Sequence, residues 1–403
     1  MNSAVPRFLD RTSPPHIFTL MLIAGTAAMA MNIFVPSLPN MAAYFDAEYS
    51  FMQLSISAYL ATSALLQLVI GPISDRYGRR RVLLIGMGVF VAASIGTILA
   101  PNAEVFLAFR MLQAAIATGM ALSRAIVRDM VDEARAASMI AYVTLGMSIV
   151  PMISPIVGGY LDEVFGWQAN FALLLALGII VWALTYADLG ETAVSRPTSF
   201  KAQVREYPEL LRSPRFWGYV MTTAFTSGIF FAYLGGAPFI GTVLYDLSPS
   251  GLGFFFAISG LGYGLGNFFS GRYSMRIGTT RMILFGTIAM TTGLSLQMLA
   301  LLFDAFGAAG FFVPFLMVAM GNGMVLPSSN AGMLSVRPHL AGSAAGLGGA
   351  IMIGGGAALS ALSGAVLSVD TGAWPLMIIM GLSLAGAIVS IILVIRRNRR
   401  LAG

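Results

Sequence analysis

The sequence predicts an all-α membrane protein whose twelve transmembrane helices form two pseudo-symmetric six-helix bundles. Hydrophobic residues make up 57% of the 403 residues and charged residues only 10%, which is more apolar surface than a soluble domain can bury. Twelve apolar segments are each long enough to cross a bilayer, at about 20 residues per crossing. The pattern that begins at Gly71 also returns 200 residues later, so the two halves of the chain are related.

The apolar segments are expected to be helices, because only helices and closed barrels satisfy the backbone in lipid and barrel strands alternate over about ten residues. Arg7, Arg11 and Ala28–Ala30 also fit a signal peptide. Its removal would leave an odd number of spans and break the repeat, so we interpret the first segment as a span. The predicted spans are 16–37, 50–73, 82–100, 104–126, 136–161, 165–188, 215–240, 250–271, 281–303, 307–330, 341–368 and 373–395.

The repeat pairs residues at one constant offset and predicts a transporter built from two halves around a central site. We expect an N-terminal bundle over residues 1–189, a cytoplasmic linker over 190–214 and a C-terminal bundle over 215–403. Four apolar residues at helical spacing between Phe200 and Leu211 predict an amphipathic helix on the membrane surface within the linker. The paired residues are Asp46 with Asp246, Gly71 with Gly271, Arg76 with Arg276, Gly78 with Gly278, and Arg81 with Arg281.

The distribution of charge predicts the orientation. Loops after even-numbered spans, together with the termini, carry the arginines, whereas loops after odd-numbered spans carry acids and no Lys or Arg. Positively charged loops remain in the cytoplasm, so both termini are expected there. The net charge of +6 therefore reflects topology, and no basic soluble face with stacking aromatics indicates a nucleic-acid partner.

Several functional classes are excluded by missing residues. The chain has no Cys, which excludes disulfides and thiolate metal sites. Its only histidines are His16 and His339, in no zinc-protease motif, and its only lysine is Lys201, in no phosphate-binding loop. We expect neither an enzyme nor a cofactor or metal, and a membrane enzyme or channel is the least favoured class. Energy must then come from an ion gradient or from the gradient of the cargo itself.

The loop from Gly71 to Arg81 contains one acid, Asp75, among basic residues. Gly71 can permit close helix approach, and Asp75 can pair with Arg128 or Arg124 of the fourth span and hold the cytoplasmic side closed. The alternative is simple anchoring of basic residues on the inside. The loop resembles the signature loop of the major facilitator superfamily, which implies that fold for the whole chain. It also implies a gating role for Gly71, Asp75, Arg76, Gly78, Arg79 and Arg128.

Arg110 lies about six residues inside the fourth span, roughly 9 Å deep. An arginine at that depth usually faces a cavity or a partner, although it can also extend to the headgroups. Gln113 shares its helix face, and we expect Arg110 to face the cavity between the bundles and to bond Gln113 or a carbonyl of the first or fifth span. The run resembles the Arg-x-x-Gln-Gly element of the superfamily, with Ala114 in place of glycine, and the resemblance implies a role for Arg110 in proton coupling.

The fifth span contains Pro151, Ser154-Pro155 and Gly158-Gly159. Proline bends a helix, and paired glycines permit tight contact with a neighbour. An ordinary kinked membrane helix is the alternative. The run resembles the element of the antiporter branch, where Gly-Pro usually stands in place of Ser154-Pro155, and this implies gating roles for Pro155, Gly158 and Gly159.

Two parts of the chain resemble the bicyclomycin-resistance (Bcr/CflA) subfamily of drug:proton antiporters. They are Asn32, followed by Pro36 and Pro39, and the run Ala121–Asp129. Many members have an aspartate where this chain has Asn32, and the side chain of an asparagine cannot titrate. No Asp or Glu lies centrally in any predicted span, so the sequence identifies no proton carrier.

The resemblance implies a monomeric secondary transporter of the bacterial inner membrane that exports small, largely apolar drugs by proton antiport with alternating access. The alternative is a metabolite transporter, either an uptake symporter or an exporter, on the same fold. A lining of methionine, aromatic and amide side chains suits bulky, neutral or weakly charged cargo. The expected substrate-binding residues are Asn32, Gln113, Tyr233 and Asn322.

Overall fold

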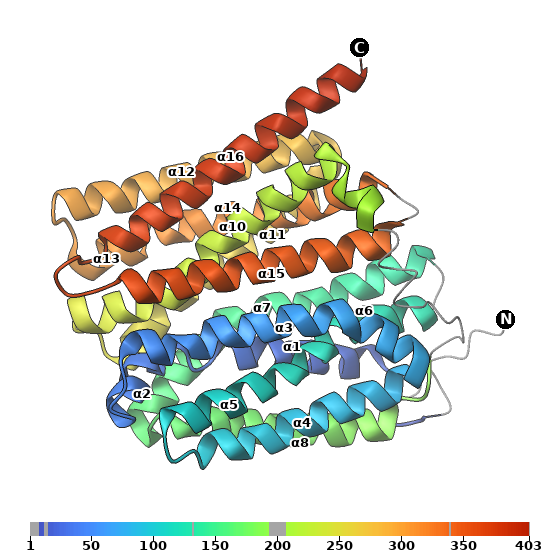
Figure 1. The fold of residues 1–403 in the computed structure, drawn as a ribbon, viewed down its shortest axis with the longest axis horizontal. Helices are drawn as coiled ribbons and strands as arrows, with labels where there is room; N and C mark the ends of the chain where they lie inside the picture. The colour runs from blue at the N-terminus through green and yellow to red at the C-terminus, as the bar shows by residue number, and fades with distance from the viewer. Residues whose placement is uncertain (1–7, 12–14, 131–132, 193–206, 338–339, 403) are drawn as a thin grey trace.

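The computed structural model describes residues 8–11, 15–130, 133–192, 207–337 and 340–402, and these residues form helices and short connections without any strand (Figure 1). The first group of helices is α1 Ile17–Asn32, η1 Val35–Ser37, α2 Leu38–Tyr44, α3 Tyr49–Tyr77, α4 Arg79–Ile98, α5 Ala103–Gln113, η2 Ala114–Ile116, α6 Ala117–Met130, α7 Glu133–Phe165 and α8 Gln168–Asp188. The second group is α10 Pro214–Phe239, η3 Ile240–Leu244, α11 Pro249–Ile277, α12 Thr279–Leu302, α13 Gly307–Phe312, α14 Phe315–Ser335, α15 Ala341–Val366 and α16 Trp374–Ala402.

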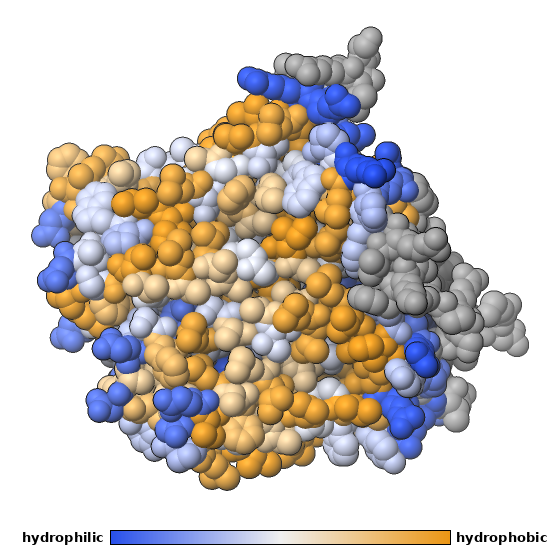
Figure 2. Space-filling view, in the orientation of Figure 1, coloured by the Kyte–Doolittle hydropathy of each residue, from blue (hydrophilic) through white to orange (hydrophobic). Residues whose placement is uncertain are grey.

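The predicted spans correspond to these helices. Within the described part of the chain, 11 helical stretches are long and apolar enough to cross a membrane, and α7 covers the remaining predicted span, 136–161. Figure 2 shows a wide band of hydrophobic residues across the middle of the molecule, between hydrophilic patches at both ends. The chain is therefore a multi-pass, all-α membrane protein.

The two groups of helices lie side by side in Figure 1, with α1–α8 in blue and green and α10–α16 in yellow to red. They meet chiefly where α3 packs on α15 and α7 packs on α11. The boundaries at 189 and 214 stay a prediction. The predicted amphipathic helix falls mostly on 193–206, outside the described residues, although residues 207–211 are helical.

Helix boundaries follow local chemistry. Ser213 and Ser248 precede prolines at the first position of α10 and α11, and their hydroxyl groups accept hydrogen bonds from Phe216 N and Gly251 N. A proline is suited to this position because its missing N–H has no partner within the helix anyway. These Ser-Pro pairs therefore start two helices of the second group at defined residues.

The repeat in the sequence is also present in the backbone. Helices α3 and α11 each contain 29 residues and begin 200 positions apart. Each ends at a glycine with positive φ, 94° at Gly78 and 91° at Gly278, and is preceded by an aspartate with positive φ, 48° at Asp46 and 51° at Asp246. Glycine adopts this conformation without steric cost and aspartate tolerates it better than most residues. The repeated residues thus mark the same two turns in each half.

The alternating helices give the molecule two ends. The end with the arginine-bearing turns at Gly78 and Gly278 is called the basic end, and the end with the turns at Asp46, Asp246 and Asp304 is called the acidic end. Both described chain ends lie toward the basic end in Figure 1.

Glycines allow α7 to contact both halves through backbone atoms. A methyl group on Gly158 would collide with the carbonyl of Ile33 at the end of α1, and one on Gly159 would collide with the carbonyl of Pro249 at the start of α11. In the same way, Gly253 of α11 lies against the carbonyl of Pro155. The expected tight contact at Gly158-Gly159 is therefore present in the structure, with one glycine facing each half.

We expect Gly158→Ala to lower the apparent unfolding temperature of the purified protein, because its methyl group has no room and overpacking costs about 1–3 kcal/mol. Gly381→Ala is the matched control, since a methyl group there meets no atom within 4 Å. Fluorescence-monitored thermal unfolding measures the difference. Equal unfolding temperatures for the two variants would contradict the backbone contact.

Candidate functional site

A cavity of about 210 Å³ lies between the two groups of helices. Its wall is formed by apolar, methionine and aromatic side chains with a few neutral polar groups, and no acidic or basic side chain of the described residues lines it. The lining residues are Ala28, Met31, Asn32, Met120, Pro151, Met152, Pro155, Ser227, Phe230, Phe231, Leu234, Phe256, Ser259, Gly260, Tyr263, Asn322, Leu326, Met352 and Ile353. Such a wall favours a bulky neutral molecule without one fixed polar pose.

Two of the four expected substrate-binding residues line this cavity. Asn32 lies near the end of α1 and donates through Nδ2 to the carbonyl of Ala28 at 2.8 Å. Asn322 lies on α14 and donates through Nδ2 to the carbonyl of Thr226 at 3.0 Å. Most of the other lining groups are apolar, and the sequence shows which residues are apolar but not which of them face the other half.

The other two expected residues lie elsewhere. Tyr233 is fully buried, stacks on Phe315 with ring centroids 3.6 Å apart, and has its hydroxyl 3.3 Å from Ser259 Oγ. Gln113 is also fully buried and donates to Ser94 Oγ at 2.8 Å. Direct cargo contact at these two positions is therefore not supported by their placement, and packing within each half accounts for their burial.

Arg110 is fully buried and does not extend toward the headgroups, nor does it line the cavity. It donates to the carbonyl of Ala30 on α1 at 2.7 Å, to the carbonyl of Ser55 on α3 at 3.2 Å and to Gln113 Oε1 at 2.9 Å. The expected bonds to Gln113 and to the first span are present. The expected exposure to the cavity is wrong, because these three acceptors hold the guanidinium inside the first half.

Aromatic rings and a helix end stabilise the Arg110 charge. The guanidinium carbon lies 4.0 Å from the ring centroid of Tyr59 and 4.4 Å from that of Phe34, and such contacts are stronger away from water. Ala30 belongs to the last turn of α1, where unpaired carbonyls carry partial negative charge. Arg110 therefore joins α1, α3 and α5 without a carboxylate partner among the described residues.

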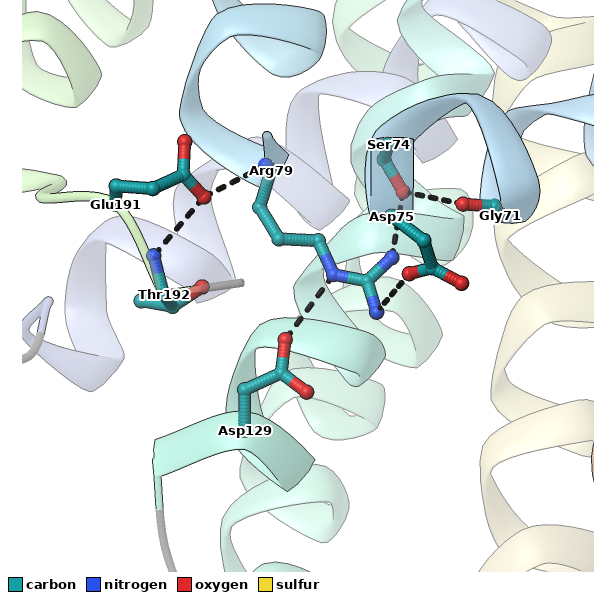
Figure 3. A network of polar contacts seen from close by, with 7 residues as sticks. All are labelled: Gly71, Ser74, Asp75, Arg79, Asp129, Glu191 and Thr192. Atoms are coloured by element: carbon teal, nitrogen blue, oxygen red, sulfur yellow. Dashed lines mark hydrogen bonds and ion pairs between the residues drawn. The ribbon is translucent and has the colours of Figure 1, made fainter. Parts of the chain in front are cut away.

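At the basic end, Arg79 lies between two carboxylates (Figure 3). Its guanidinium pairs with Asp75 at 2.7 Å and with Asp129 of α6 at 3.0 Å. Its backbone N–H donates to Glu191 Oε1 at 2.8 Å, so that carboxylate caps the start of α4. These four residues form the Arg79 network, in which Asp129 and Glu191 were not predicted.

The structure revises the expected roles in this loop. Asp75 pairs with Arg79 and is linked to helix α6 through Asp129, while the side chain of Arg128 lies outside the described residues. Arg76 is exposed and lies over the ring of Tyr77. A methyl group on Gly71 would meet no atom within 4 Å, so close helix approach does not explain that glycine in this conformation.

The second copy of the loop lacks the network. Arg276 and Arg281 make no ion pair among the described residues, and a methyl group on Gly278 would meet nothing within 4 Å. The corresponding Gly78 lies against the Glu191 carboxylate. Only the first half therefore carries the acid-bridged form of this loop.

The two halves are joined at the acidic end. Gln53 of α3 donates through Nε2 to the carbonyl and the hydroxyl of Ser360, both at 2.7 Å, and the Tyr49 hydroxyl donates to the carbonyl of Gly235 at 2.9 Å. Ser250 N donates to Glu163 Oε2 at 3.4 Å. These hydrogen bonds close the structure at the acidic end.

Asp162 is a buried acid at the same end of α7. It accepts a hydrogen bond from Asn40 Nδ2 at 2.9 Å. Burial raises the pKa of the Asp162 carboxyl above its usual value, Glu163 acts in the same direction, and hydrogen bonds from Ser37 and Asn40 partly offset the rise. Folding therefore shifts the Asp162 carboxyl toward its neutral form relative to the unfolded chain.

Two groups of membrane helices, a central uncharged cavity and a closed end define a transporter of small molecules, not an enzyme. Residues 20–361 match the model of the Major Facilitator Superfamily, and the chain belongs to this family.

Curated relatives include transporters and resistance proteins. The chain is 31% identical to an uncharacterised MFS-type transporter of Bacillus subtilis over 86% of this chain and 88% of that one. It is 31% identical to a chloramphenicol resistance protein of Pseudomonas aeruginosa over 79% and 76% of the two chains. It is 25% identical to a bicyclomycin resistance protein homologue of Haemophilus influenzae over 96% and 98%. The resemblance to the drug:proton antiporter branch is thereby confirmed.

The fold is also that of solved transporters. A bacterial homologue of the human lysosomal transporter Spinster, in an inward-facing and occupied conformation, superposes with a TM-score of 0.70 at 16% sequence identity and covers 95% of this chain and 96% of that one. At this identity the match shows the shared fold alone.

We expect Asp162→Asn to raise the apparent unfolding temperature more at pH 8 than at pH 5. Because the folded pKa lies above the unfolded value, the buried charge costs stability fully above the folded pKa, and this cost disappears as the pH falls. Thermal unfolding at the two pH values measures this, with Asp370→Asn in an exposed loop as the control. A difference between variant and parent that does not change with pH would contradict the buried charge.

Proposed function

We propose that the protein exports small, largely apolar drugs across the bacterial inner membrane by proton antiport with alternating access. The uncharged cavity of methionine, aromatic and amide side chains between the halves is the observation that carries the proposal. The names of the chloramphenicol and bicyclomycin resistance relatives support export as the direction. The protein acts as a monomer, its cargo is a small molecule, and protons are the coupling ion.

The arginine distribution supports an orientation with the basic end and both termini in the cytoplasm. The closed acidic end then faces outward, which corresponds to an inward-facing stage of the transport cycle. In this stage cargo enters from the cytoplasm, and the contacts of Gln53, Tyr49 and Glu163 with the other half must break before it leaves.

The Arg79 network is proposed to control the basic end during this cycle. One guanidinium joins α3, α4 and α6, so movement of the loop after α3 is coupled to the end of α6. Pro155, Gly158 and Gly159 are proposed to act as the pivot on the opposite side, because α7 contacts both halves there through backbone atoms.

We expect Arg79→Gln to reduce export at least about tenfold while membrane insertion persists, because two carboxylates lose their shared partner. Arg81→Gln is the control, since Arg81 is exposed and also basic. Efflux from loaded cells and the amount of protein in the membrane are both measured. Equal export by the two variants would show that the network only anchors the loop.

Arg110 is proposed to influence proton coupling as a positioning residue, by fixing the end of α1 that carries Asn32. It touches neither the cavity nor a titratable carboxylate among the described residues. Its effect on the cycle must therefore pass through the arrangement of α1, α3 and α5.

We expect Arg110→Lys to lose most gradient-driven export, about tenfold or more, because a point charge cannot serve three acceptors arranged around a planar group. Arg110→Ala is expected to lose it entirely. Cargo binding to the purified protein, measured in the same variants, separates positioning from direct contact and should change little for Arg110→Lys. Parental export rates in Arg110→Ala would contradict any role in transport.

The proposed function is tested by drug accumulation in bacterial cells that lack their own pumps, with and without a protonophore. Expression should lower the accumulation of chloramphenicol, and the protonophore should abolish the difference. A lower accumulation that survives the protonophore would exclude proton antiport, and no difference for any neutral aromatic drug would favour a metabolite transporter.

A further inference from the structure

Two residues of the cavity wall carry a buried oxygen atom without a hydrogen-bond partner. Asn322 Oδ1 on α14 and Ser227 Oγ on α10 are both unpartnered, although the residues are only 2% and 3% exposed. Buried polar atoms are normally satisfied in folded proteins, and exceptions indicate a functional role. Both residues line the same cavity.

The orientation of the Asn322 amide is determined by its surroundings. Its Nδ2 donates to the carbonyl of Thr226 at 3.0 Å. In the reversed orientation two oxygen atoms would face each other, so Oδ1 must point away from that carbonyl. The unpartnered atom, Asn322 Oδ1, is therefore an acceptor. The carbonyl that binds the other end of this amide belongs to Thr226, the residue before Ser227.

Two donors of the cavity wall are already used within helices. Asn32 Nδ2 donates to the carbonyl of Ala28, and Ser259 Oγ donates to the carbonyl of Phe255 at 3.3 Å. Asn322 Oδ1 can only accept and Ser227 Oγ can accept as well as donate, which favours an uncharged cargo group that donates. A cationic cargo is disfavoured because no carboxylate of the described residues lines the cavity.

We propose that Asn322 Oδ1 and Ser227 Oγ form a subsite for a hydrogen-bond donor, a hydroxyl or an amide N–H, carried by a neutral aromatic cargo. Phe230 and Phe231 follow Ser227 on the same helix and line the same cavity, so an aromatic ring next to the donor is accommodated. The subsite rests on the proposed function, since it assumes that cargo occupies this cavity. It narrows the substrate class from apolar drugs to neutral aromatics with a donor.

The subsite predicts discrimination between two ligands that differ in one hydrogen-bond donor. The probes are 4-phenylphenol, which carries a hydroxyl donor, and 4-methoxybiphenyl, in which a methyl group replaces the hydroxyl proton. Each competes with labelled chloramphenicol for the purified protein in lipid nanodiscs. The parent should bind the phenol about five- to tenfold more tightly than the methyl ether, because a buried acceptor left without a donor is unfavourable.

Asn322→Leu and Ser227→Ala should each reduce this ratio toward one, mainly through weaker binding of the phenol. Asn267→Leu is the matched control, because Asn267 also donates to a helix carbonyl, that of Tyr263 at 2.9 Å, but does not line the cavity. Retained binding of the methyl ether shows that each variant is folded, and the smaller Ser227→Ala change tests the subsite independently of Asn322.

The experiment distinguishes failure of the subsite from failure of the proposed function. Equal binding of both probes by the parent, or an unchanged ratio in Asn322→Leu and Ser227→Ala, would overturn the subsite and leave the proposed function standing. Absence of chloramphenicol binding to the parent, together with unchanged drug accumulation in cells, would overturn the proposed function.

Discussion

In a bilayer, every backbone and charged group must find its partner inside the protein, and this constraint explains most of the architecture. It restricts the chain to helices and moves the left-handed turns at Asp46, Gly78, Asp246 and Gly278 to the two ends of the molecule. It also explains why the one arginine deep in a span is surrounded by helix carbonyls and aromatic rings. Arg110 satisfies the constraint with neutral acceptors, and in doing so it fixes the relative positions of α1, α3 and α5.

The same constraint produces an asymmetry between the two ends. Side-chain and backbone hydrogen bonds join the halves at the acidic end, whereas the ion pairs of the Arg79 network, Asp75–Arg79 and Arg79–Asp129, lie within the first half. Backbone contact at Gly159 and Gly253 lets α7 and α11 approach closely. Apart from the Glu163 carboxylate, the groups in these contacts between the halves are neutral and none of the contacts is an ion pair, which suits the proposed alternating access.

Periodicity, charge and repeats predicted the fold because each is a property of the sequence alone. Gly78 and Gly278 share a conformation that glycine permits, so a repeated glycine reliably predicted a repeated turn. The site was less predictable because burial of a polar residue has two explanations. Asn32 and Asn322 line the cavity, while Gln113 and Tyr233 are equally buried and pack inside their own halves. Glu191 was missed because its partner, the N–H of Arg79, lies 112 residues away and leaves no local pattern.

The uncharged cavity restricts how protons can be coupled to cargo. Asn32 cannot titrate, and no predicted span has a central acid. The proposed antiport therefore has no carboxylate among the described lining residues to hold a proton beside the cargo. Two of the described acids, Asp129 in the Arg79 network and Asp162 at the closed acidic end, lie at opposite ends of the molecule. Under the proposed antiport, we infer that coupling acts through opening and closing of the ends, with Arg110 proposed to keep α1 in register between them.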